Sequence, residues 1–231
     1  FGTGLEYVTY KNNTYQKFIY QNNEETFSFS SELNFVKTSI FGQISKKALG
    51  NKLIASLGIR TDQNSYSKEM SKPLKQLSPR LSIAYTLGEI SSLNFNIGQY
   101  FQLPAYTVMG YENNLGELVN KNNGITYINN KQIVLGLETN PGNFSIITLE
   151  GFYKRYNNYP FVLGDSISLA NLGGNFGVIG NEAVNSSSQG RSYGIEFLAQ
   201  KKLNKSFYGI LAYTWVRSEF KDKYNAFVPS A

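Results

Sequence analysis

Two glutamates provide the first pair of residues that could carry out chemistry. Glu138 and Glu150 lie on segments that the sequence pattern predicts to be neighbouring strands, and glycoside hydrolysis uses a pair of carboxylates. That reaction also requires surroundings that raise the pKa of one carboxyl group, and no apolar cleft is indicated around either residue. We therefore expect no catalytic residues and no enzyme activity.

The absence of two residue types excludes further kinds of catalytic and metal-binding site. The chain has no His and no Cys, which removes the commonest general base, the commonest zinc ligands and any disulfide framework. Scattered acids in or next to the connections, such as Asp62, Asp165 and Glu182, lack the spacing of a calcium loop. The Gly-rich stretch 173–180 lacks the spacing of a dinucleotide-binding motif and indicates a flexible loop. We expect no metal and no cofactor.

The net charge of +6 comes from scattered residues. Lys and Arg lie mostly at the ends of predicted strands and in connections, whereas a nucleic-acid-binding surface would gather them into a patch or stripe. The pattern indicates a solvated rim, and we expect no nucleic-acid partner.

The elements that position these residues are predicted to be long strands. With 231 residues, 41% of them hydrophobic and 16% charged, the chain is large enough for one large β domain or two small ones. No apolar run approaches the ~20 residues of a membrane helix. Alternation with period two marks nine segments, most of them close to the ~9–11 residues of a strand that crosses a bilayer. They are 3–10, 34–46, 52–62, 79–87, 91–102, 131–139, 144–156, 191–202 and 206–219.

The connections alternate between short and long. The short ones are KALGN, GEIS, NPGN and LNK, and the long ones are 11–33, 63–78, 103–130 and 157–190. Tight turns at one end of a sheet and long loops at the other are typical of an up-and-down outer-membrane barrel, with its short periplasmic turns and long extracellular loops. A soluble sandwich is not expected to separate its loops in this way.

The hairpin around GEIS has matching faces. Leu93, Phe95 and Ile97 alternate with Asn94, Asn96, Gly98 and Tyr100, so the first set is expected to face lipid and the second a water-filled lumen. The apolar faces of the two strands coincide when Leu87 lies opposite Leu93 and Tyr85 opposite Phe95. We expect the strand to end, and a long loop to begin, at Gln102–Tyr106, because Pro104 has no N–H to donate.

The hairpin around NPGN requires a shifted register. A plain two-residue Pro-Gly turn would place Ile133 opposite Glu150 and bring a charge onto the apolar face. A bulge or an odd-length loop corrects this mismatch. We therefore expect Leu137 opposite Ile147 and Leu135 opposite Leu149.

Aromatic residues gather towards the loop-side ends of the predicted strands. Rings with an apolar body and a polar tip suit the membrane–water interface, so we interpret these residues as an outer aromatic girdle. They are Tyr10, Tyr66, Tyr100, Phe101, Tyr153, Tyr156, Tyr193, Tyr213 and Trp215.

Six stretches in a fixed order carry a resemblance to a known family. They are LIASLGIRTD (Leu53–Asp62), LSPRLSIAYTL (Leu77–Leu87), NFNIGQYFQLPAY (Asn94–Tyr106), VLGLE (Val134–Glu138), EGFYKRYNNYPF (Glu150–Phe161) and GRSYGIEFLAQKKL…FYGILAYTWVRSEF (Gly190–Phe220). In this order they resemble the C-terminal barrel half of TonB-dependent outer-membrane receptors, most closely those of Bacteroidetes type. The resemblance covers nearly the whole chain.

The resemblance implies that residues 1–231 are a partial β-barrel domain of a longer receptor. The family has a barrel of about 22 strands, closed by a plug domain that this chain lacks, and the chain would supply about nine strands of the wall. Such a receptor binds a scarce solute outside the bacterial outer membrane and imports it with energy from TonB. Its expected partners are the TonB system, the plug domain, outer-membrane lipid, an unknown small solute (siderophore, glycan or peptide) and a surface lipoprotein.

Two other classes of function fit the pattern. One is a passive outer-membrane porin or structural barrel, and the other is a soluble β-rich carbohydrate-binding or adhesive module. Sequence that precedes Phe1 would separate receptor from porin, and detergent dependence would separate both from the soluble module.

Two groups of residues are candidates for a site in a receptor. Tyr rings stack on sugars or aromatic siderophores, and Asn and Gln side chains orient a solute through hydrogen bonds. The candidate substrate-binding residues are Tyr100, Gln102, Tyr106, Tyr111, Asn113, Tyr127, Tyr156 and Asn157. A polar network that faces the lumen is expected from Arg60, Arg80, Glu138, Glu150, Lys154 and Glu196.

Overall fold

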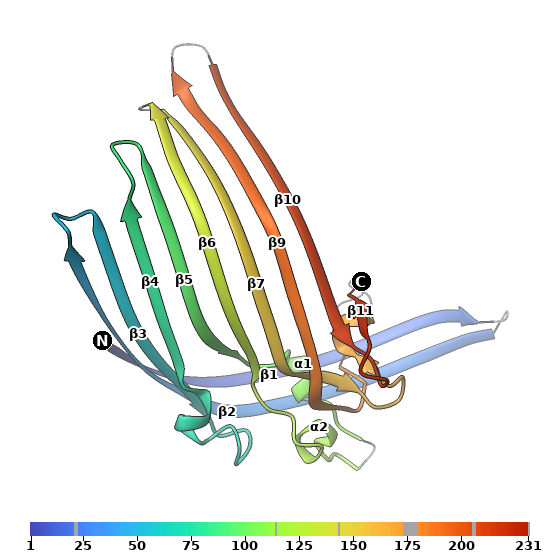
Figure 1. The fold of residues 1–231 in the computed structure, drawn as a ribbon. Helices are drawn as coiled ribbons and strands as arrows, with labels where there is room; N and C mark the ends of the chain where they lie inside the picture. The colour runs from blue at the N-terminus through green and yellow to red at the C-terminus, as the bar shows by residue number, and fades with distance from the viewer. Residues whose placement is uncertain (21–22, 114, 143, 173–179, 205–206, 231) are drawn as a thin grey trace.

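The segments with period two form one curved antiparallel sheet in the computed structural model (Figure 1). The structure describes residues 1–20, 23–113, 115–142, 144–172, 180–204 and 207–230, so most of the predicted loop 173–180 lies outside the described residues. The strands are β1 (Gly2–Tyr20), β2 (Asn23–Ala48), β3 (Leu53–Asn64), β4 (Ser78–Thr86), β5 (Ser91–Gln102), β6 (Ile128–Gly142), β7 (Ser145–Val162), β8 (Ile167–Ser168), β9 (Val184–Asn204), β10 (Phe207–Lys221) and β11 (Phe227–Pro229).

The strands follow one another in the sheet in chain order, with β8 alone off this path, paired to β7. This confirms the prediction of an all-β, up-and-down antiparallel sheet. All nine predicted strands are present, and the described chain adds the short β8 and β11. In the described ranges, no helix has the length and apolar composition needed to cross a membrane.

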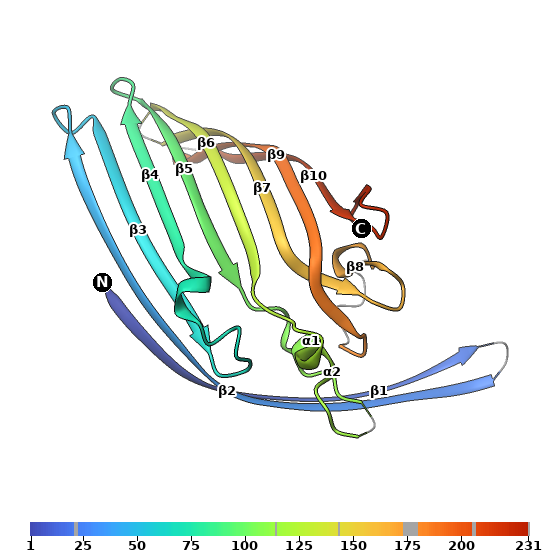
Figure 2. The same ribbon diagram turned by 60° about the horizontal axis from the view of Figure 1, so that its bottom comes forward.

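The predicted long loop 11–33 is wrong. β1 and β2 remain paired from Gly2 opposite Phe41 to Tyr20 opposite Asn23, although Asn, Ser and Glu in this stretch have low strand propensity. Since β3 covers β2 only from Lys37 onward, the outer half of this hairpin pairs with itself alone. Figure 2 shows it extending past the rest of the sheet.

The registers of two hairpins differ from the prediction by two residues. Tyr85 lies opposite Leu93, where Leu87 was expected. Leu137 lies opposite Leu149, where Ile147 was expected, and the ladder is irregular beyond Thr139. A slip of two residues keeps every side chain on its predicted face, so the apolar faces coincide and Ile133 pairs with Tyr153 and not with Glu150.

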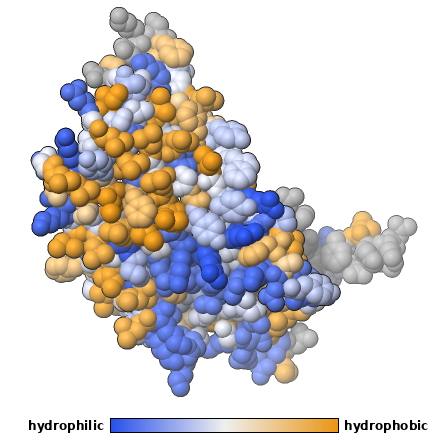
Figure 3. All heavy atoms as spheres, viewed as in Figure 1, coloured by the Kyte–Doolittle hydropathy of each residue, from blue (hydrophilic) through white to orange (hydrophobic). Residues whose placement is uncertain are grey.

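One face of the sheet, which we call the apolar face, carries large hydrophobic side chains that are 40–70% exposed. They are Ile44, Leu57, Ile97, Ile133, Leu135, Leu137, Leu149, Tyr153, Ile195 and Trp215. Figure 3 shows hydrophobic residues gathered over the strands and hydrophilic residues below them, where the loops lie. Exposed apolar patches of this kind mark membrane or protein contacts.

The opposite face, which we call the inner face, is partly covered by the long connections. In their described residues, connections 65–77, 103–127 and 163–183 form what we call the loop layer. It contains the helices α1 (Tyr106–Met109) and α2 (Val119–Asn122) and the 3-10 helices η1 (Pro73–Gln76) and η2 (Leu169–Asn171).

The hydrophobic core lies between the inner face and the loop layer, because the loops supply apolar residues to side chains of β2. Its members are Leu33, Phe35, Tyr66, Met70, Val108, Met109, Ile125, Tyr127, Val162 and Val184. The core therefore joins segments that are far apart in sequence at the loop end of the sheet.

Asn120 of α2 ties two of the loops together and is fully buried. Its Nδ2 donates to the carbonyl oxygen of Val108 at 2.7 Å and to that of Glu182 at 2.9 Å. Its Oδ1 accepts a hydrogen bond from the backbone N–H of Val184 at 2.8 Å. One side chain thus hydrogen-bonds to backbone groups of two connections and of the first residue of β9.

Candidate functional site

A hollow of about 570 Å³ opens on the inner face where β3, β4 and β5 reach the loop layer. It brings together four of the candidate binding residues, Tyr100, Gln102, Tyr106 and Tyr127, and two of the candidate network residues, Arg60 and Arg80. Its other lining residues are Lys37, Asp62, Phe101, Leu103, Pro104 and Ala105.

The end of β5 positions the aromatic wall of this hollow. The strand ends at Gln102 and the buried Pro104 follows, as the sequence predicted. Gly98 lies opposite Arg80, and a Cβ atom at Gly98 would come within 2.9 Å of the Tyr100 ring. The absence of a side chain at Gly98 therefore lets the Tyr100 ring lie over the strand, where the Arg80 guanidinium carbon is 4.4 Å from its centroid.

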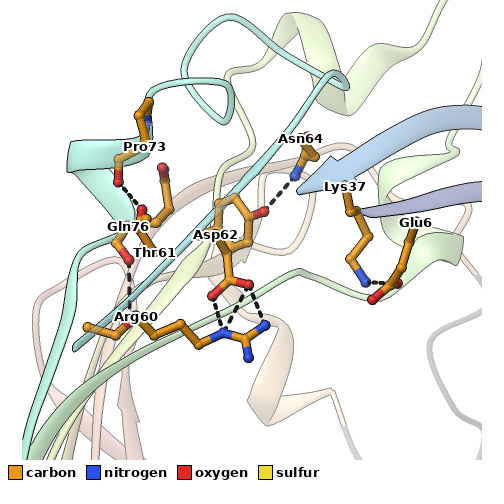
Figure 4. Close-up of polar contacts among 10 residues, drawn as sticks. Glu6, Lys37, Arg60, Thr61, Asp62, Asn64, Pro73 and Gln76 are labelled. Atoms are coloured by element: carbon orange, nitrogen blue, oxygen red, sulfur yellow. Dashed lines mark hydrogen bonds and ion pairs between the residues drawn. The ribbon is translucent and has the colours of Figure 1, made fainter. Parts of the chain in front are cut away.

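The hollow carries more positive than negative charge. The Arg60 guanidinium donates to both carboxylate oxygens of Asp62, at 2.7 and 2.8 Å, and Lys37 Nζ lies 2.7 Å from Glu6 Oε2 (Figure 4). Arg80 forms no ion pair with any carboxylate of the described residues. Its contact with the ring of Tyr100 is a cation–π interaction, which leaves its charge uncompensated.

Lys37 and Asp62 were not among the predicted site residues. Both belong to predicted strands, and both lie at inner-face positions, since Lys37 is opposite Asn64 and Asp62 is two residues from Arg60. Charged residues at inward positions near a loop were therefore the available signal.

Two buried tyrosines lie at the loop end of the sheet, and one of them, Tyr127, lines the hollow. Tyr127 accepts a hydrogen bond from Asn64 Nδ2 at 2.9 Å, and Tyr66 donates to the carbonyl oxygen of Met109 at 2.7 Å. Burial raises the pKa of both phenols, that of Tyr127 to about 12. Both side chains are accordingly neutral parts of the core, and Tyr127 offers little surface to a solute.

These shifts predict a loss of stability at alkaline pH. An unfolded tyrosine loses its proton near pH 10, whereas folded Tyr127 keeps its proton to about pH 12. The unfolded state therefore binds fewer protons in this window, and stability falls as the pH rises above 10, while it is fully present below pH 10. Phenolate absorbance of the full-length protein should show a late-titrating fraction that Tyr127→Phe reduces and that denaturant abolishes. The same titration curve with and without denaturant would contradict this.

The remaining binding candidates lie outside the hollow. Asn113 Oδ1 accepts hydrogen bonds from the N–H groups of Leu115 and Glu117, so its side chain shapes its own turn, and Tyr111 lies in the same loop. Tyr156 is on the inner face and stacks on Phe220 at 5.6 Å. Asn157 lines a hollow of the apolar face. A binding role for these four residues stays a prediction.

The six residues of the predicted polar network share the inner face, but they do not form one connected network. Glu150 lies opposite Glu196 on β9, Lys154 Nζ is 4.7 Å from the ring of Phe152, and Glu138 accepts a hydrogen bond from Asn140. Within the described residues, no ion pair joins any two of the six. Their role in a network with a plug domain stays a prediction.

Five of the nine predicted girdle residues lie on the apolar face, and a girdle at the membrane interface stays a prediction. Tyr153, Tyr193, Tyr213 and Trp215 lie at apolar-face positions in neighbouring strands, and Phe101 lines a hollow at the loop end of that face. The other four predicted girdle residues do not lie on the apolar face, because their position in the strand or their packing against the loop layer directs them inward. These are Tyr10, Tyr66, Tyr100 and Tyr156.

A family model described as "TonB dependent receptor-like, beta-barrel" matches residues 1–230. Among solved structures, the chain is similar to the copper transporter OprC, at 15% identity and TM-score 0.56, with 94% of this chain and 37% of that chain covered. It is also similar to the siderophore receptor PirA from Pseudomonas aeruginosa, at 15% identity and TM-score 0.57, with coverages of 94% and 43%. It is similar as well to the alcaligin outer-membrane receptor FauA from Bordetella pertussis, at 13% identity and TM-score 0.56, with 99% of this chain and 41% of that chain covered.

These structural likenesses, all at low sequence identity, concern the fold. The chain spans about two fifths of the length of each of these three proteins. No curated protein matches the chain in sequence.

Proposed function

We propose, from the premise that this chain belongs to the family of TonB-dependent receptor β-barrels, that it forms part of the wall of an outer-membrane receptor that imports a scarce solute with energy from TonB. The observation that carries the proposal is the single apolar face on long up-and-down strands, with the loop layer and a charged hollow on the opposite face. A plug domain and the TonB system are the partners that such import requires. The Bacteroidetes-type assignment and a surface lipoprotein partner stay predictions.

The inner hollow is the part of this chain that we propose contacts the solute. Arg80 supplies an uncompensated positive charge, Tyr100 a ring face and Gln102 amide hydrogen bonds. This set suits a solute that combines an acidic or hydroxyl-rich part with a flat or apolar part. Siderophore, glycan and peptide solutes all fit this description.

The dependence on TonB is tested by genetics on the full-length protein. A strain that lacks the receptor, a strain that lacks TonB and the double mutant are grown on media that limit one nutrient at a time. We expect one medium in which the three strains share the same defect, because both proteins serve one uptake route. A defect that persists without any contribution from TonB would support a passive porin instead.

Replacing Arg80 with Gln tests the role of the hollow. Loss of a charge-assisted contact is expected to raise the solute concentration for half-maximal uptake by about tenfold, since such contacts contribute roughly 1.5–3 kcal/mol. Lys68→Gln is the control, because Lys68 is an exposed cation on the β3–β4 connection. Equal uptake by the Arg80 variant and the wild type, when the outer membrane contains equal amounts of the two proteins, would show that Arg80 does not contact the solute.

A further inference from the structure

A second polar hollow lies on the apolar face, at its loop end. It has a volume of about 460 Å³, and Lys75, Lys131, Arg155 and Asn129 are among its lining residues. It adjoins an apolar hollow of about 520 Å³, and the two share Gln99, Lys131 and Arg155. A basic hollow thus continues directly into an apolar one on the same surface.

The sheet places like charges side by side at this boundary. Lys131 of β6 lies directly opposite Arg155 of β7, which lies directly opposite Arg191 of β9. Like charges in such cross-strand pairs are destabilising. An anion bound between these side chains would replace the repulsion among them with attraction to the anion.

One end of this basic row is neutralised within the protein. The buried carboxylate of Glu219 pairs with Arg191 at 2.7 Å and with Arg217 at 2.6 Å. No carboxylate of the described residues forms an ion pair with Lys131 or Arg155, and Lys75 is paired with Glu69. The uncompensated charge is therefore centred on Lys131 and Arg155, where the two hollows meet.

Asn129 gives independent evidence for a missing acceptor. Its side chain lines the basic hollow and is only 6% exposed, yet its Nδ2 has no hydrogen-bond partner in the described structure. A buried donor that stays unsatisfied is destabilising. An oxygen-rich anion beside Lys131 and Arg155 would supply the acceptor.

The adjoining apolar hollow is suited to bind a hydrocarbon chain. Its wall includes Leu57, Ile97, Ile133 and Tyr153, which are exposed in the described structure. In a bilayer, where the surrounding lipid tails are equally apolar, an alkyl chain is favoured here by close van der Waals packing against this wall and not by removal of water.

We propose that these two hollows form one binding site for a phosphate-bearing lipid. The phosphate lies between Lys131 Nζ, the Arg155 guanidinium and Asn129 Nδ2, and an acyl chain lies along the apolar hollow. Phosphate oxygens suit this donor set, because guanidinium binds them in bidentate fashion and ammonium and amide groups add further donors. The inference rests on the proposed membrane location but not on any solute or on TonB.

The test uses the full-length protein, purified in detergent and stripped of lipid. Thermal unfolding is followed with phosphatidic acid, with diacylglycerol of the same chains, and with inorganic phosphate. We expect phosphatidic acid alone to raise the unfolding temperature. In the double variant Lys131→Gln/Arg155→Gln, its apparent affinity should fall by about tenfold or more, while the lipid-free protein becomes more stable because the like charges are gone.

Lys46→Gln is the matched control, because Lys46 is exposed on the apolar face near the turn end of β2, opposite Ala55. This variant should keep the response to phosphatidic acid. In the wild-type protein, phosphatidic acid should also protect Arg155 from an arginine-specific reagent, which tests the site without any substitution.

Four results would overturn the proposal. An equal response to diacylglycerol would show that the protein does not recognise the phosphate group. An equal response to inorganic phosphate would show that the protein does not recognise the acyl chain of the lipid. An unchanged response in the double variant, or no protection of Arg155, would place the lipid elsewhere. Nutrient uptake is measured separately, so failure of this proposal is distinguishable from failure of the proposed receptor function.

Discussion

Replacing Asn120 with Ala is expected to destabilise the loop layer by about 3 kcal/mol, because a buried group left without its hydrogen bond costs roughly 1–3 kcal/mol. The substitution leaves the carbonyl oxygen of Glu182 and the N–H of Val184 without the hydrogen bonds that Asn120 now makes, and it removes the 2.7 Å hydrogen bond to the carbonyl oxygen of Val108. Hydrogen exchange in the full-length protein should show this as about hundredfold faster opening of loop amides, while the strand amides of β3 to β7 stay protected.

Asn122→Ala is the control for this experiment. Asn122 lies on the same short helix but is exposed, so its removal should leave exchange in the loop layer nearly unchanged. Similar exchange in the Asn120 and Asn122 variants would show that Asn120 does not hold the loops together.

Replacing Gly194 with Ala is expected to lower the free energy of unfolding of the sheet by about 3 kcal/mol, the upper end for overpacking. A Cβ atom at Gly194 would collide with the carbonyl oxygen of Trp215 and approach Phe152 Cζ to 3.0 Å and Val216 Cα to 3.1 Å. Because two of these obstacles belong to the neighbouring backbone, the strands themselves must separate. Denaturant unfolding of the full-length protein in detergent measures the change.

Gly151→Ala provides a comparison from the adjacent strand. Gly151 lies opposite Ile195, and a Cβ atom there would meet nothing within 4 Å. This variant should be neutral or slightly more stable, since Ala restricts the unfolded chain more than Gly. Equal destabilisation by the two substitutions would mean that the loss reflects the strand in general and not the close approach at Gly194.

The faces and turns of the sheet could be predicted from sequence because both depend on local patterns. Alternation fixes which side Leu93, Phe95 and Ile97 occupy, and Pro104 marks the end of β5. The partners across each hairpin could not be predicted, because a slip of two residues leaves the faces unchanged. The continuation of β1 and β2 was missed because its polar residues have low intrinsic strand propensity.

The candidate site was predictable where it lies on strands and not where it lies on loops. Arg60, Arg80 and Tyr100 could be assigned to the inner face from strand parity, and the structure places them around one hollow. The burial of Tyr127 and Tyr66 depends on loops that fold back onto β2. Their apolar partners, such as Val108 and Met109, follow no period in the sequence, so their packing is decided by tertiary contacts alone.

The chain order of the strands has a consequence for how the protein folds. Because sheet neighbours are also sequence neighbours, each strand finds its partner across a single connection. Closing a connection costs entropy that rises with its length, by about 0.6 kcal/mol for each doubling. The hairpins with short connections, which are β1–β2, β2–β3, β4–β5, β6–β7 and β9–β10, are therefore expected to form early. The contacts that Asn120 makes between connections form last, so the sheet is assembled before its hollow is enclosed.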